Sequence, residues 1–153
     1  MNMQSHEQVE YRSSVADLAV STTIHCLIGC AIGEIVGLIL GVMLGWSVLT
    51  MIVVATAFAF ITGFLLTLIP LMGRVKLSIA EAFRIVWLGE TISIGVMEIA
   101  MNAIDYVAGG MNVTSIVDPV FWSSFVLALI ASFLAGYPVN YLMIKTNLKT
   151  KWH

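Results

Sequence analysis

Apolar residues run through the chain in long stretches that short polar links separate. An α-helix needs about 20 apolar residues to cross the hydrocarbon core of a bilayer, because lipid offers no partner to a backbone amide. Four stretches reach that length, at residues 17–45, 48–69, 78–107 and 120–144. The pattern predicts an all-α, polytopic membrane protein. Its four-helix bundle, residues 17–144, would lie between a cytoplasmic N-terminal segment, 1–16, and a cytoplasmic basic tail, 145–153.

Local signals mark the starts of three of these helices. The turn before residue 48 is very short, so the first two spans form an antiparallel hairpin with Ser47 as the N-cap of the second. Ser78 followed by Glu81 is typical of a capping box. Asp118 and Pro119 form a pair that commonly opens a helix.

The composition excludes two broad classes of protein. The chain has 153 residues, of which 59% are hydrophobic and 10% charged, whereas a soluble domain carries roughly a quarter charged residues. Seven Lys and Arg and a net charge of -2 do not supply the basic face that nucleic acid requires, so no nucleic-acid partner is expected.

Cys26 and Cys30 lie one helical turn apart, with Cβ atoms roughly 6 Å from each other, which predicts free thiols.

The basic residues indicate how the spans are oriented, because Lys and Arg beside a span resist translocation. They all fall on one side of the predicted spans: Arg12, Arg74, Lys76, Arg84, Lys145, Lys149 and Lys151. The opposite links carry Asp105 and Asp118 and no basic residue. We therefore predict a multi-pass protein with both termini inside, in the prokaryotic cytoplasmic membrane.

The first span carries a glycine at every fourth position: Gly29, Gly33, Gly37, Gly41 and Gly45. Each glycine weakens an isolated helix by about 1 kcal/mol relative to alanine. Five in register therefore indicate close backbone contact with a neighbouring helix, with a ligand groove as the alternative.

The same span carries metal-ligand side chains beside the glycines. His25, Cys26, Cys30 and Glu34 supply imidazole, thiol and carboxylate groups, and thiols favour Cu(I) or Zn(II). His25 and Cys26 point about 100° apart, so they share an ion only if the helix is distorted or another helix adds ligands.

The third span supplies the partners for such a site. Six of its residues fall within about 140° on a helical wheel: Glu90, Met97, Glu98, Met101, Asn102 and Asp105. Intramembrane carboxylates are costly, so they should face the bundle interior. Helix rise places Cys30 level with Glu90, and Glu34 near Glu98. In the alternative interpretation, the cysteines and methionines are ordinary apolar side chains that pack in the core. In the fourth span, Asn140 can hydrogen-bond across helices.

These motifs resemble DUF4396, a family of small four-helix integral membrane proteins without an assigned function. The resemblance covers residues 22–144. It rests on residues 24–34 (IHCLIGCAIGE), 68–71 (LIPL), 91–99 (TISIGVMEI), 118–122 (DPVFW) and 137–140 (YPVN). The family pattern carries an acidic residue just after residue 99, where this chain has Ala100, Met101 and Asn102. The resemblance implies the fold and no activity.

Together these features predict a protein that binds, and transports or relays, a transition metal, with copper favoured and zinc as the second choice. The main metal ligands would be His25, Cys26, Cys30 and Glu34, and the third span would add Glu90, Met97, Glu98 and Met101. Asn102, Asp105 and Asn140 would be polar residues of the bundle interior. The alternative is a non-catalytic accessory subunit whose glycine face docks onto a larger membrane complex, such as a copper-dependent oxidase or monooxygenase. Either role suits a homo-oligomer or a complex in the lipid bilayer. No nucleophile stands beside a general base apart from the diverging His25 and Cys26, so no enzyme is expected.

Overall fold

Four long helices account for most of the described chain. The computed structural model describes residues 3–76 and 78–146, and the side chains of residues 14–73, 76 and 78–146. Within that part lie α1 (Met3–Leu44), α2 (Val48–Val75), α3 (Ile79–Ala108), the short 3-10 helix η1 (Gly110–Asn112) and α4 (Pro119–Lys145). Each long helix contains an apolar segment that is long enough to cross a bilayer. The predicted all-α, four-helix membrane architecture is confirmed.

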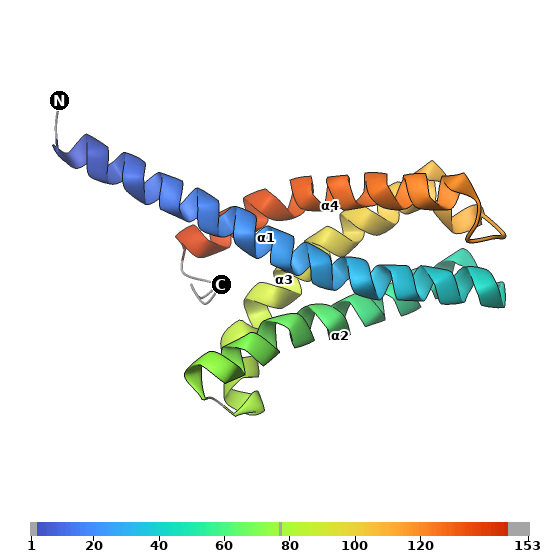
Figure 1. Ribbon diagram of the computed structural model, residues 1–153, viewed down its shortest axis with the longest axis horizontal. Helices are drawn as coiled ribbons and strands as arrows, with labels where there is room; N and C mark the ends of the chain where they lie inside the picture. The colour runs from blue at the N-terminus through green and yellow to red at the C-terminus, as the bar shows by residue number, and fades with distance from the viewer. Residues whose placement is uncertain (1–2, 77, 147–153) are drawn as a thin grey trace.

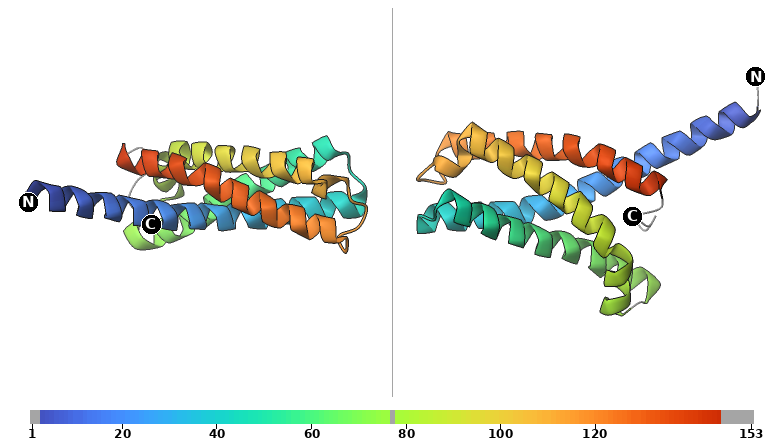
Figure 2. Two further views of the ribbon diagram at one scale, coloured as in Figure 1. Left: turned by 90° about the horizontal axis from the view of Figure 1, so that it is seen from above. Right: turned by 180° about the vertical axis from the view of Figure 1, so that it is seen from behind.

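The helices form one bundle in which consecutive helices run in opposite directions (Figures 1 and 2). α1 packs against α2 and α4, and α3 packs against α4 and α2. The α1–α2 and α3–α4 links lie together at one end, which we call the linked end. The α2–α3 link lies at the opposite end, where α1 diverges from the α2–α3 pair (Figure 1). The start of α1 and the end of α4 also point to this second end, as the alternating order of spans requires.

The predicted helix starts are present as hydrogen-bonded caps. The Thr50 amide donates to Ser47 Oγ at 3.4 Å. Ser78 and Glu81 form the reciprocal capping box, with the Ser78 amide donating to Glu81 Oε2 at 3.0 Å. At the start of α4, the Val120 amide donates to Asp118 Oδ1 at 2.9 Å. These bonds satisfy backbone donors that a helix start leaves unpaired, and so fix where each helix begins.

The glycine stripe of α1 is the contact surface for α2. A Cβ built on Gly29 would lie 2.7 Å from the Gly63 Cα, and Cβ atoms on Gly33 and Gly37 would overlap the backbone at Ala59 and Ala55. Thr62 adds a hydrogen bond across this contact, from its Oγ1 to the Gly29 carbonyl at 2.6 Å. The two backbones therefore approach closely along several turns, as small residues permit in membranes.

Two glycines of the stripe behave differently from the first three. Gly41 faces the Met51 side chain rather than the backbone of α2. A Cβ on Gly45 would meet nothing within 4 Å, and its φ of 64° ends the helix. The prediction of helix packing is therefore wrong for Gly45, whose left-handed conformation closes the turn into α2.

The faces of the helices that point away from the bundle are apolar. On α1, Ile24, Ile28 and Ile32 are exposed at the spacing of one helical turn, on the side away from the glycine stripe. A water-soluble protein would not present such rows of large apolar side chains over all four helices. This exterior suits the hydrocarbon core of a membrane.

Two helices extend beyond the predicted spans. α1 continues back to Met3, well before residue 17. α2 continues past Pro70 to Val75, although the apolar pattern ends at residue 69. Pro70 lacks the backbone N–H of one helical hydrogen bond, but the carbonyl left without that donor can accept from another group. The helix therefore continues through the proline.

Candidate functional site

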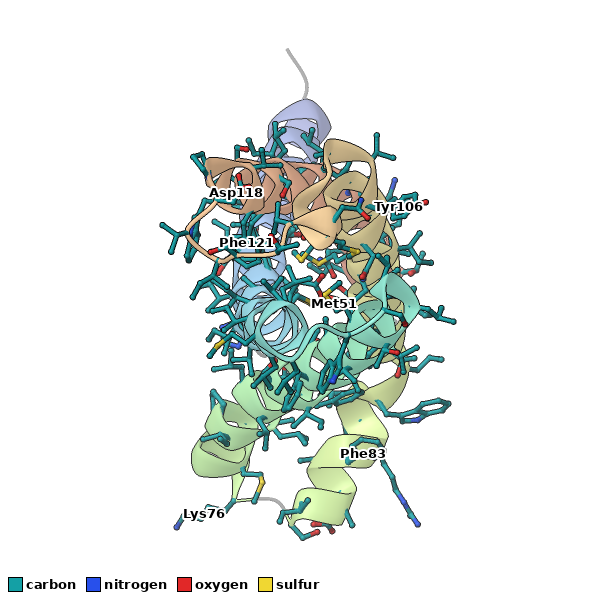
Figure 3. All side chains as sticks on the ribbon, turned by 90° about the vertical axis from the view of Figure 1, so that its right-hand side faces the viewer. Met51, Lys76, Phe83, Tyr106, Asp118 and Phe121 are labelled. Atoms are coloured by element: carbon teal, nitrogen blue, oxygen red, sulfur yellow. The ribbon has the colours of Figure 1, made fainter. Side chains whose placement is uncertain are left out.

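Four sulfur-bearing side chains lie together in the centre of the bundle. Cys26 and Cys30 from α1 and Met97 and Met101 from α3 belong to one buried cluster, and none is more than 3% exposed. We call these four residues the sulfur cluster. Figure 3 looks along the bundle from its linked end and shows sulfur atoms between the helices near the labelled Met51, which belongs to a second buried cluster. Side chains from the predicted faces of α1 and α3 therefore share one buried cluster, to which Ala59, Ile94 and Ala128 also belong.

A network of polar side chains joins Cys26 to three helices. Cys26 Sγ lies 4.0 Å from Glu90 Oε2 and 3.4 Å from Ser93 Oγ. Ser93 donates to Asn140 Oδ1 on α4 at 2.9 Å, and Asn140 Nδ2 donates to Thr23 Oγ1 on α1 at 3.0 Å. All of these residues are buried. The network fixes the position of the Cys26 thiol relative to α3 and α4.

A group of carboxyls lies beyond Cys30, toward the linked end of the bundle. Glu34, Glu98 and Asp105 are each at most 2% exposed. Glu34 lies beside Glu98, and Asp105 is near enough to act electrostatically on Glu34. Five carboxyl oxygens of these residues have no hydrogen-bond partner within the usual distance: both oxygens of Glu34, both oxygens of Asp105, and Glu98 Oε1. We call these three residues the acidic group.

Polar side chains from α2 and α3 support Glu98. Asn102 Nδ2 donates to Glu98 Oε2 at 3.4 Å and to the Glu98 carbonyl at 2.9 Å. The same amide nitrogen lies 3.3 Å from Thr56 Oγ1 on α2. Glu98 also lies beside the Cys30 thiol. Glu98 therefore connects the acidic group to the sulfur cluster.

The pairing between α1 and α3 differs by about one turn from the predicted pairing at one position. Helix rise predicts Cys30 level with Glu90, but Cys26 contacts Glu90 and Cys30 lies beside Glu98. The predicted neighbours Glu34 and Glu98 are indeed close. The prediction from helix rise assumes parallel, straight helices, whereas α1 and α3 diverge at one end (Figure 1).

His25 lies on a different face from the sulfur cluster and has a structural partner. Its Nε2 donates to the Leu66 carbonyl on α2 at 2.9 Å. Leu66 lies four residues before Pro70, which has no N–H to donate to that carbonyl. The imidazole therefore replaces the helical hydrogen bond that Pro70 removes. The prediction of His25 as a metal ligand is not supported by this placement.

Helix α4 shapes the surroundings of Met97. A Cβ on Gly136 would lie 2.7 Å from Met97 Cγ and 2.8 Å from Met97 Sδ. Ser132 Oγ donates to the Met97 carbonyl at 3.2 Å. Gly136 therefore provides the space in which the Met97 thioether lies.

The electrostatics of the interior are dominated by acids. The basic residues all lie outside segments 13–73 and 85–144, so no Lys or Arg is available to pair with the acidic group at mid-helix. Among the residues with described side chains, no three His, Cys, Asp or Glu side chains are grouped closely enough to hold a metal ion. Thioethers are not among those four side-chain types. The sulfur cluster therefore holds the four predicted sulfur donors in one place in the described part of the chain.

Two pockets reach the interior side chains. A cleft of about 300 Å³ between α2 and α3 is lined by Thr56, Phe60, Glu98 and Asn102, among others. A larger pocket, of about 640 Å³, lies at the linked end and is lined by Met43, Met51 and Met111 together with residues of both links.

Several interior residues were not identified from the sequence: Thr23, Thr56, Ser93, Ser132 and Gly136. They are small and common in membrane helices, where they carry no charge that marks them. Ser93 lies three residues after Glu90 and four before Met97, on the face already singled out, and that spacing is the signal that was available.

Comparison with known proteins places the chain in one family. No significant match was found among curated proteins or among solved structures. The model of DUF4396, a domain of unknown function, matches residues 17–149, which include all of the helix pairs described above. The chain therefore belongs to the DUF4396 family.

Proposed function

We propose that this protein binds Cu(I) at the sulfur cluster and relays it within the membrane. The observation that carries the proposal is the burial of two thiols and two thioethers in one cluster contributed by α1 and α3. Thiolate and thioether ligands are soft donors that select Cu(I). A methionine in a helix core is often simple packing, but here two methionines meet two cysteines that have acidic neighbours.

The charge of the interior suits a monovalent metal ion. Binding of Cu⁺ with release of one thiol proton exchanges one positive charge for another, so the bundle keeps the same net charge. This matters in lipid, where an added uncompensated charge is costly. Glu90 lies beside Cys26 and Glu98 lies beside Cys30, so each thiol has an acidic neighbour.

Zinc fits this arrangement less well than copper. Zn²⁺ takes four ligands in tetrahedral geometry, usually from cysteine, histidine and carboxylate groups. The described side chains contain no group of three such residues, and His25 is engaged with α2. Cu(I) is therefore the metal that the donor set favours.

The accessory-subunit alternative loses the feature on which it depended. The glycine face of α1 was the expected docking surface, but Gly29, Gly33 and Gly37 pack against α2 of the same chain. The metal-binding proposal rests on buried side chains and does not depend on that face.

A competition titration tests the proposal. The purified full-length protein is titrated anaerobically with Cu(I) in the presence of a chromogenic Cu(I) chelator. Two double variants and one single variant are titrated in the same way. Cys26→Ser with Cys30→Ser should abolish competition with the chelator, and Met97→Leu with Met101→Leu should weaken it. Met143→Leu is the matched control, because Met143 is 5% exposed and lies outside the sulfur cluster. Equal competition by the wild type and the double cysteine variant would refute the proposal.

A further inference from the structure

A second group of methionines lies at the linked end of the bundle, away from the sulfur cluster. Met51 on α2 and Met111 in η1 are 3% and 1% exposed and share an apolar cluster with Phe121. Met43 on α1 is 69% exposed and lines the same pocket of about 640 Å³. Three separate elements, α1, α2 and η1, therefore each contribute a thioether to one pocket, which we call the outer methionine pocket.

The space beside Met51 depends on a glycine. A Cβ on Gly41 would lie 2.6 Å from Met51 Sδ and still closer to its Cγ. Gly41 is the member of the glycine stripe that contacts a side chain of α2 rather than its backbone. Its missing side chain lets the Met51 thioether lie against α1 at the pocket. Gly41 therefore provides the space for the Met51 side chain, as Gly136 does for Met97.

The lining of the pocket carries no charged residue. Besides apolar groups, the polar side chains at its wall are neutral: Ser47, Asn112 and Thr114. A hard divalent cation would find no carboxylate there, whereas a soft monovalent cation would find thioethers. Neutral ligands hold Cu(I) less tightly than thiolates do, because they offer no opposite charge, and so they release it more readily.

The outer methionine pocket and the sulfur cluster share a packing neighbour. Leu129 on α4 packs against the buried cluster that contains Met51 and Met111, and also against the one that contains Met97 and Met101. Thioethers therefore occur in two adjoining layers of the core. A neutral layer lies at the linked end, and the layer with thiols lies deeper.

We propose that the outer methionine pocket is an acquisition site for Cu(I), from which the ion passes to the sulfur cluster. The proposal rests on the proposed function for the destination of the ion. The order of donors, neutral thioethers first and ionisable thiols second, makes the transfer favourable toward the bundle centre. Positive-inside orientation places the pocket on the outer side, since its links carry no Lys or Arg.

Methyl NMR with a silver probe tests both sites separately. The full-length protein, labelled with ¹³C at the methionine methyl groups and purified in detergent micelles, is titrated with Ag⁺, a soft monovalent ion that is stable in air. Resonances are assigned with single Met→Leu variants. We expect the Met97 and Met101 signals to shift first, and those of Met51 and Met111 to shift at higher Ag⁺. In Cys26→Ser with Cys30→Ser, Met51 and Met111 should become the first to respond.

The outcomes separate this inference from the proposed function. Shifts at Met97 and Met101 with unchanged Met51 and Met111 signals would overturn the acquisition site and leave the proposed function standing. Shifts at Met51 and Met111 alone would overturn the transfer to the sulfur cluster, and with it the proposed function. Met143, buried outside both clusters, should stay unchanged throughout. Gly41→Ala should weaken only the outer response, because the added methyl group displaces the Met51 thioether.

Discussion

His25 is a residue type that often binds metal, but here its contact is structural. The imidazole donates to the carbonyl that Pro70 leaves without a helical partner, so its position on α1 follows from a proline on α2. A buried carbonyl without a donor costs about 1–3 kcal/mol. The pair therefore stabilises the α1–α2 contact rather than holding a ligand.

A double-mutant cycle tests this interpretation of His25. His25→Ala should destabilise the protein by about 1–3 kcal/mol, because the Leu66 carbonyl loses its donor. In a Pro70→Ala background the same substitution should cost less, since alanine in place of the proline restores the backbone donor. Thermal unfolding in detergent gives both values. An unchanged cost in the Pro70→Ala background would contradict the account, as would a loss of Cu(I) binding in His25→Ala.

Glu34 is one of the buried carboxyls whose oxygens lack a hydrogen-bond partner. It is fully buried, and neither of its carboxyl oxygens has a hydrogen-bond partner. Glu34→Met, which keeps the length of the side chain, should therefore raise stability by about 1–3 kcal/mol, because an unpaired buried polar group is removed. The midpoint of thermal unfolding measures this. A fall in the midpoint would show that Glu34 has a stabilising partner in the folded protein.

At the scale of elements, close contact between α1 and α2 depends on residues without side chains. Gly33 faces the backbone at Ala59, so Gly33→Ala should force the helices apart and cost about 1–3 kcal/mol. Gly95→Ala is the matched control, because a Cβ there meets nothing within 4 Å. The change in the midpoint of thermal unfolding, relative to the wild type, should therefore differ in sign or size between the two variants. Equal effects would mean that helix propensity, and not contact, decides the outcome.

The contact between α4 and α3 offers a way to disturb the sulfur cluster without removing a ligand. Gly136→Ala should displace the Met97 thioether, since the new Cβ would lie 2.8 Å from its sulfur atom. We expect the affinity for Cu(I) to fall about 10- to 100-fold, as is usual when a support of a metal ligand changes. The chelator competition assay measures the change. Unaltered affinity would remove Met97 from the ligand set.

The sequence was sufficient for those elements whose signals are local. The caps at Ser47, Ser78 and Asp118 were predictable because each acts within four residues of its own helix start. The register between α1 and α3 was not, because it depends on how two non-adjacent helices diverge. For the same reason Asn140 could be placed in the interior, whereas its bonds to Ser93 and Thr23 could not be foreseen.

At the scale of the whole molecule, the bundle has a basic end and an end without basic residues. Lys76 and Arg84 flank the α2–α3 link, and both links at the other end lack Lys and Arg. The acidic group and the sulfur cluster lie between these ends, away from the lipid-facing surface. This polarity underlies the predicted orientation and the direction in which copper would enter.

Impermeant maleimide labelling in intact cells tests the orientation. Val117→Cys, at a position that is 82% exposed in the α3–α4 link, should be labelled from outside. Ile79→Cys, at a position that is 65% exposed beside the α2–α3 link, should be labelled only after the membrane is broken. The native thiols provide no background, because Cys26 and Cys30 are buried. The reverse labelling pattern would invert the predicted topology.

X-ray absorption spectroscopy of copper bound to the purified, full-length protein identifies the atoms that hold the metal. Copper at the sulfur cluster should give a Cu(I) edge and a first shell of sulfur atoms, and both should be lost with the copper itself in Cys26→Ser with Cys30→Ser. A first shell of only oxygen or nitrogen atoms, or the same copper content in both proteins, would contradict the proposal.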